Sequence, residues 1–93
     1  MADQQAPEKP SLSLYEYSSC PYCARVRSFL GSLGETVESR DVSRDRSHLQ
    51  ELVRATGSQM VPCLRIEPRE GEAQWVHESA DIIEYLREHF AGS

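Results

Sequence analysis

The sequence lacks long apolar runs and a surplus of basic residues. No uninterrupted apolar run exceeds three residues, Tyr22, Cys23 and Ala24, so we expect neither a membrane-spanning helix nor the apolar part of a signal peptide. Ten Lys and Arg stand against 15 Asp and Glu, for a net charge of −5, which is opposite to the footprint of a nucleic-acid-binding protein. We therefore expect neither a membrane nor a nucleic acid as partner.

Cysteines are also few. Their number is three, odd as well as small, which argues against a framework of disulfides and indicates a reducing compartment. We therefore expect a cytoplasmic protein. Two of the three, Cys20 and Cys23, enclose only Pro21 and Tyr22, and this pair is the first candidate for a functional site.

The length and composition fit one small domain with one core. The chain has 93 residues, of which 39% are hydrophobic and 27% charged, as in an ordinary globular domain. Residues 1–10 are polar, contain two prolines and show no periodicity. We expect them to form a flexible N-terminal arm ahead of a folded domain over residues 11–91.

Strand and helix patterns alternate in the first half of the chain. Residues 11–16 alternate loosely between polar and apolar side chains, which predicts a strand. Apolar residues then recur at helical spacing over residues 21–33, and Gly34 follows where a helix ends. A short strand is expected over residues 36–42 and a second helix over about residues 45–55.

The second half predicts a hairpin and a last helix. Residues 61–66 and 74–77 have strand patterns, and residues 68–71 form a turn between them. Ser79 is the expected N-cap of a helix that ends near residue 90. The predicted order is β-α-β-α-β-β-α, an α/β fold with a four-stranded mixed sheet flanked by three helices.

The Cys-x-x-Cys pair lies between a predicted strand and the first turn of a helix. In that context the motif indicates a thioredoxin-like redox centre. The free N–H groups and the dipole of a helix N-terminus favour negative charge, so Cys20 is the expected thiolate nucleophile. Cys23, one turn inside the helix, is expected to be more buried and to act as the resolving thiol. The alternatives are half of a structural zinc site and a pair of core cysteines.

Pro62 and Cys63 stand at the start of the third apolar run. A proline is not expected in a central strand, so either this strand is an edge or the Val61–Pro62 bond is cis; a trans proline that begins the strand is the alternative. Cys63 is expected to be a buried, inert core residue. A regulatory or cluster-binding thiol is the other possibility.

Several of these segments together resemble the glutaredoxin family. They are Cys-Pro-Tyr-Cys at residues 20–23, Arg25, Val61-Pro62, and Glu-Ser-Ala-Asp-Ile at residues 78–82, which is similar to the same helix start in glutathione transferase N-terminal domains. The resemblance covers about residues 11–90 and implies a monomeric thioredoxin fold without a metal. It also implies glutathione as the reducing co-substrate, and reduction of protein disulfides and glutathione mixed disulfides in client proteins.

The resemblance also implies a glutathione site. Val61 would pair its backbone with the cysteinyl unit, Pro62 in a cis bond would face the first cysteine, and Tyr22 would flank the tripeptide. Glu78 and Ser79 would hold the γ-glutamyl end. Glu78 can meet its ammonium, while the Ser79 hydroxyl and the free N–H groups of the last helix can meet its carboxylate.

The sequence departs from the pattern of many family members at three positions. Tyr17 stands where a lysine is common, Met60 where a threonine is common, and Ala80 where an aspartate is common, so one anion-binding group is missing. A function of another class is a module in which Cys20 and glutathione hold an iron-sulfur cluster between two subunits, which a visible absorption band would indicate. A redoxin reduced by thioredoxin reductase is a third possibility.

Overall fold

The computed structural model describes residues 10–91, so nearly all of the predicted N-terminal arm over residues 1–10 lies outside the described residues. The elements follow one another in the predicted order. They are β1 (Ser11–Glu16), α1 (Pro21–Leu33), β2 (Glu38–Asp41), α2 (Arg46–Thr56), β3 (Cys63–Glu67), β4 (Gln74–His77) and α3 (Ser79–Ala91).

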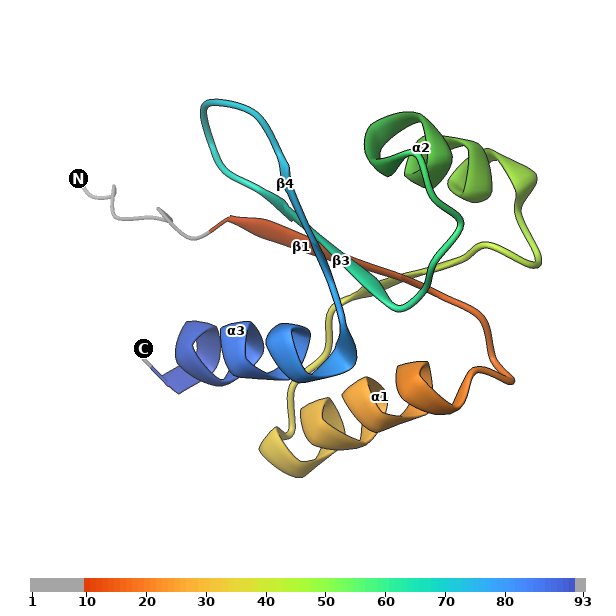
Figure 1. The fold of residues 1–93 in the computed structure, drawn as a ribbon. Coiled ribbons are helices and arrows are strands. Elements are labelled where there is room, and N and C mark those ends of the chain that lie inside the picture. The colour runs from red at the N-terminus through yellow and green to blue at the C-terminus, as the bar shows by residue number, and fades with distance from the viewer. Residues whose placement is uncertain (1–9, 92–93) are drawn as a thin grey trace.

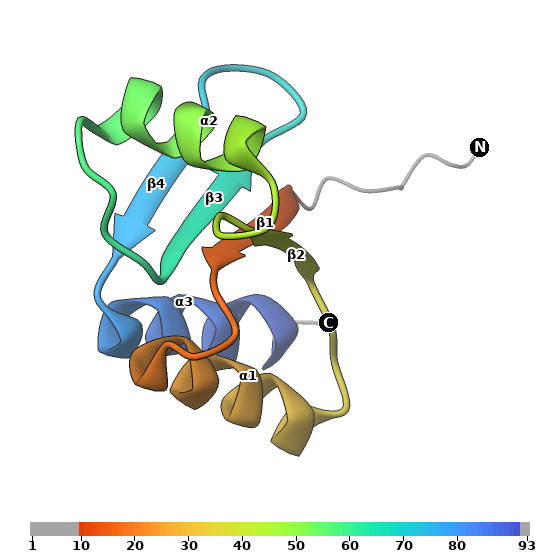
Figure 2. The ribbon, with the colours of Figure 1, turned by 90° about the vertical axis from the view of Figure 1, so that its right-hand side faces the viewer.

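The four strands form one mixed sheet in the order β2-β1-β3-β4. β1 runs parallel to β2 and antiparallel to β3, and β3 runs antiparallel to β4. Helices α1 and α3 lie side by side on one face of this sheet, and α2 covers the other face (Figures 1 and 2). The predicted thioredoxin-like fold is therefore confirmed.

The helix ends follow from residues with the right side chains or backbone freedom. Asp45 caps α2 by accepting the N–H of Ser47 at 2.9 Å, as acidic N-caps do. Gly34 and Gly57 end α1 and α2 with φ angles of 71° and 75°, in the left-handed region that glycine enters without cost. These caps fix where each helix stops and the next strand begins.

The hydrophobic core has a part on each face of the sheet. The larger part lies beneath α1 and α3 and consists of buried aliphatic residues: Leu14, Val26, Leu30, Leu64, Ile66, Ile82 and Leu86. On the α2 face, the fully buried residues Tyr15, Leu52 and Cys63 form the smaller part. Because β1 and β3 supply residues to both parts, they are the central strands of the sheet.

Three local expectations differ from the structure. The third strand covers Cys63–Glu67 rather than residues 61–66, so Val61 and Pro62 precede it. The second strand covers Glu38–Asp41 rather than residues 36–42, because this edge strand is polar and pairs only with β1. Ser79 is the first helical residue of α3 rather than its N-cap. The carbonyl of Glu78 accepts the N–H of Ile82 at 3.0 Å, so Glu78 occupies the cap position.

Pro62 directly precedes β3, and Cys63 is the first residue of this strand. Cys63 is fully buried on the α2 face, and it has no disulfide partner. Burial raises the pKa of its thiol to about 12.

Every helix within residues 10–91 is too short or too polar to span a bilayer.

We predict that Cys63 makes the stability of the fold sensitive to alkali. Because its folded-state pKa of about 12 lies above the ordinary value of 9.0, its contribution is complete below pH 9.0 and is lost as the pH rises toward 12. The free energy of unfolding of the unchanged protein should therefore fall more steeply than that of Cys63→Ala in this range, by about 1.4 kcal/mol per pH unit. Urea unfolding of both proteins across this range measures the difference, and parallel curves would contradict the prediction.

A candidate active site at one edge of the sheet

The register of the central strands brings three distant segments together. Tyr15 of β1 pairs with Cys63 of β3, and Cys63 pairs with His77 of β4. The segment after β1, the segment before β3 and the segment after β4 therefore leave the sheet at the same edge. These segments carry the dithiol, the Val61–Pro62 pair and the Glu78–Ser79 pair, respectively.

The dithiol lies where β1 connects to α1. Cys20 is the N-cap of α1, and its Sγ accepts the backbone N–H of Cys23 at 3.1 Å. The backbone N–H of Cys20 in turn donates to the carbonyl of Tyr17 at 3.2 Å. These two hydrogen bonds fix the Cys20 sulfur to the first turn of α1 and the backbone of Cys20 to the loop before it.

The two thiols have different environments. Cys20 is 3% exposed and Cys23 is 0% exposed, so Cys23 is the more buried of the two, as the sequence predicted. Burial, together with the hydrogen bond to Cys20, raises the pKa of Cys23 to about 12. The Cys23 thiol therefore keeps its proton at neutral pH. Both cysteines are free in this structure.

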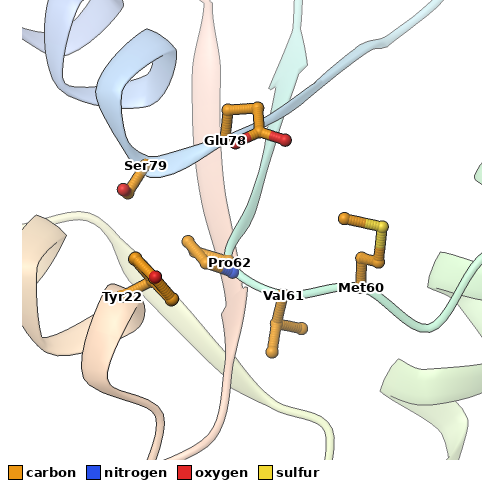
Figure 3. A pocket seen from close by; sticks show the side chains of 6 residues that line it. All are labelled: Tyr22, Met60, Val61, Pro62, Glu78 and Ser79. Atoms are coloured by element: carbon orange, nitrogen blue, oxygen red, sulfur yellow. The ribbon is translucent and has the colours of Figure 1, made fainter.

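The Val61–Pro62 peptide bond is cis, as predicted, and a pocket of about 300 Å³ opens beside it. Figure 3 shows Tyr22 of α1 on one side of Pro62 and the start of α3 on the other. The residues that line this pocket are Tyr22, Met60, Val61, Pro62, Glu78 and Ser79. The structure thus brings together all five residues for which the sequence predicted contact with glutathione.

Met60 is the lining residue that sequence reasoning did not assign to the site. Its side chain is 56% exposed and enters the pocket directly before Val61. Its place beside the Val-Pro pair was the available signal, but Met60 was noted only as a departure from the family pattern. With Tyr22, which is 58% exposed, it gives the pocket an apolar rim.

The charges around the pocket are uneven. Among the lining residues, Glu78 is acidic and none is basic. The guanidinium of Arg25 lies over the ring of Tyr22, 5.7 Å from its centroid, and so brings a positive charge to the α1 side. Within residues 10–91, no group of three or more His, Cys, Asp or Glu side chains is placed to hold a metal ion.

Glu78 has an unusual backbone. Its φ of 74° makes it the one non-glycine residue with positive φ in the described part of the chain. For a residue with a Cβ this region costs roughly 1–2 kcal/mol, and such outliers cluster at ligand sites. The strain coincides with the point where β4 turns into α3 at the wall of the pocket.

A comparison with protein families decides the relationship of the chain to known proteins. The profile described as glutathione S-transferase, N-terminal domain, matches residues 14–93. The chain belongs to this family. None of the curated proteins matches the sequence. The predicted relationship to glutathione transferase N-terminal domains is therefore confirmed, whereas the finer glutaredoxin assignment stays a prediction.

Three of the solved structures similar to this glutathione S-transferase N-terminal domain are those of longer proteins. A maleylacetoacetate isomerase from Anaeromyxobacter dehalogenans, with bound GSH in its active site, is 28% identical over 88% of the chain, with a TM-score of 0.63. Glutathione transferase E6 from Drosophila melanogaster is 26% identical over 89%, with a TM-score of 0.65. Glutathione transferase Omega 2S from Trametes versicolor shares the fold, with 17% identity over 89% and a TM-score of 0.71. The chain spans 36% to 38% of the length of these proteins.

We predict that glycine at position 78 stabilises the domain. Glu78→Gly should raise the free energy of unfolding by about 1 kcal/mol relative to Glu78→Ala, because only glycine adopts φ of 74° without strain. Gly34→Ala is the reciprocal control. The φ of Gly34 is 71°, and an added Cβ would meet no atom within 4 Å, so Gly34→Ala should lower the free energy of unfolding by a similar amount. Urea unfolding compares the variants, and equal stabilities of the two Glu78 variants would contradict the prediction.

Proposed function

We propose that this domain binds glutathione in the pocket beside Pro62 and reduces disulfides through Cys20 and Cys23. The observation that carries the proposal is that the helix-capping thiol and the segments lining that pocket leave the sheet at the same edge, with Tyr22, which lies between the two cysteines, among the lining residues. The bound GSH of the isomerase from Anaeromyxobacter dehalogenans supports the choice of ligand. The clients would be glutathionylated or disulfide-containing proteins.

The chemistry of glutathione fits the residues of the pocket. Its γ-glutamyl end carries an ammonium and a carboxylate, so a matching site needs an acceptor and donors. Glu78 supplies the acceptor. The hydroxyl of Ser79 and the first N–H groups of α3, which have no partner four residues back in the helix, supply donors to the carboxylate.

The reaction is a pair of thiol-disulfide exchanges. The Cys20 thiolate attacks the glutathionyl sulfur of a mixed disulfide, forms an S–S bond with it and releases the client thiolate, which takes up a proton. A second glutathione thiolate then attacks the same glutathionyl sulfur. This step yields glutathione disulfide and restores the Cys20 thiolate. Overall, the sulfur of the incoming glutathione is oxidised and the client sulfur is reduced, while the glutathionyl sulfur stays in a disulfide.

Cys23 serves disulfides that lie within a client protein. It can attack the mixed disulfide between Cys20 and the client, which closes a Cys20–Cys23 disulfide and releases the second client thiol. The glutathionyl intermediate on Cys20 is resolved by an incoming glutathione thiolate, so that cycle needs no second thiol of the protein. The two cysteines therefore have separable roles.

The dithiol favours disulfide reduction over conjugation of glutathione to electrophiles. In conjugation the glutathione thiolate itself attacks the electrophile, whereas a nucleophilic thiolate of the protein attacks glutathionyl sulfurs that are already part of a disulfide. Cys20 occupies the end of α1 at which a thiolate is stabilised by N–H groups. A second thiol within one turn, at Cys23, fits only the redox reaction.

The assignment of roles predicts different results for the two cysteine variants. With a glutathionylated peptide, glutathione, and glutathione reductase coupled to NADPH, Cys20→Ser should lose turnover, because a serine hydroxyl is not a nucleophile toward sulfur at neutral pH. Cys23→Ser should keep turnover of this substrate and lose reduction of a client's internal disulfide. Cys63→Ala serves as the control for loss of a buried thiol. Equal loss in both variants would contradict the assignment.

The glutathione site predicts a specific role for Glu78. Glu78→Ala should weaken glutathione binding by about 1–3 kcal/mol, the usual cost of leaving a charged partner group unpaired. The matched control is Asp81→Ala, which removes another exposed carboxylate from the first turn of α3 without touching the pocket lining. Calorimetric titration with glutathione measures both. An unchanged affinity in Glu78→Ala would place the tripeptide elsewhere.

A further inference from the structure

A buried carboxylate lies at the end of β1, directly before the loop that carries Cys20. Glu16 is 5% exposed. Its carboxylate accepts a hydrogen bond from the guanidinium of Arg27 in α1 and another from the hydroxyl of Ser39 in β2. Three elements therefore meet at this one side chain. The sequence alone does not indicate this network, because Glu16 is one of several polar residues in an alternating strand.

Arg27 also reaches the Cys20 loop. Its Nη2 donates to the carbonyl oxygen of Ser18 at 3.4 Å, while Nη1 bonds Glu16. These bonds connect the loop of residues 17–20, which lies between β1 and α1, to the side of α1. Arg27 follows Cys23 by four residues, one turn further along α1. The first turn of α1 therefore binds the Cys20 sulfur, and the side of the same helix binds the loop.

The charge of Glu16 acts on Cys23, the second cysteine of the pair. Its carboxylate raises the pKa of Cys23, after burial, the hydrogen bond with Cys20 and the charge of Cys20. The guanidinium of Arg27 forms an ion pair with the Glu16 carboxylate. Its positive charge offsets the negative charge of Glu16, which alone would destabilise a thiolate nearby.

We propose that Arg27 is a positioning residue for Cys20: it holds the loop that places the sulfur at the start of α1 and neutralises Glu16 beside the dithiol. The inference rests on the proposed function only in taking Cys20 as the nucleophile. Loss of Arg27 should have two effects of the same sign. A looser loop weakens the bond from the Cys23 N–H to Cys20 Sγ, and an unpaired Glu16 repels the thiolate.

The test is the pH profile of Cys20 alkylation by iodoacetamide, with the labelled residue identified by peptide mass. This readout needs neither glutathione nor a client, so it can fail while the proposed function stands, and the reverse also holds. Access to the sulfur changes the plateau rate at high pH. Stabilisation of the thiolate changes the pH at half-maximal rate, and this quantity is the one that the proposal concerns.

Three variants separate the two effects. Arg27→Met should move the half-maximal rate upward by about one pH unit, so that alkylation below it slows about tenfold. Arg27→Lys, with one compact ammonium in place of the planar, forked guanidinium, should give a smaller shift. The double variant Glu16→Gln with Arg27→Met removes both the charge of Glu16 and the hydrogen bond of Arg27 to the loop. The shift that remains in this variant therefore measures the effect of the loop alone.

The matched control is Arg87→Met, which breaks an arginine–glutamate pair with Glu84 on the surface of α3 and should leave the profile unchanged. Arg27→Met leaves a buried carboxylate unpaired and can fail to fold. The double variant buries no unpaired charge and then decides the question. A profile of folded Arg27→Met that superimposes on that of the unchanged protein would overturn the proposal, as would a double variant that returns fully to the original profile.

Discussion

The register of β1, β3 and β4 is the constraint on which the rest of the site depends. Tyr15, Cys63 and His77 form one row across the sheet, and the chain leaves the sheet just beyond each of them. A slip of one residue would turn every side chain of a strand to the other face. It would put Cys63 among the aliphatic residues beneath α1 and α3, and it would carry Pro62 away from the dithiol.

Local signals in the sequence were enough to predict most of the fold. Helical spacing followed by Gly34 predicted the end of α1, because glycine adopts the left-handed conformation of such a cap without strain. The dithiol was predicted from its spacing and its place before a helix. The residues of the pocket beside Pro62 were expected only from the resemblance to glutaredoxins, and the structure brings all five of them together.

What the sequence did not predict depends on tertiary contacts. The burial of Glu16 requires a partner from α1 and another from β2, and no local pattern shows that Arg27 and Ser39 will reach it. The displacement of Ser79 from cap to first helical residue has a similar origin. The positive φ of Glu78 sets the direction in which the chain enters α3, and the sequence shows only a serine with good capping propensity.

Two features near the dithiol lower stability where an apolar or flexible residue would serve the fold better. Burying the Glu16 carboxylate against the half-exposed guanidinium of Arg27 has a desolvation cost that packed apolar side chains avoid, and the backbone of Glu78 would be relaxed by glycine. Both lie at the edge of the sheet where the Cys20 loop and the segments that line the pocket meet. Sites that need fixed charges and fixed backbone directions commonly accept such costs. The coincidence of both features with Cys20, rather than with the opposite edge of the sheet, therefore favours function over folding as the reason that this chain carries them.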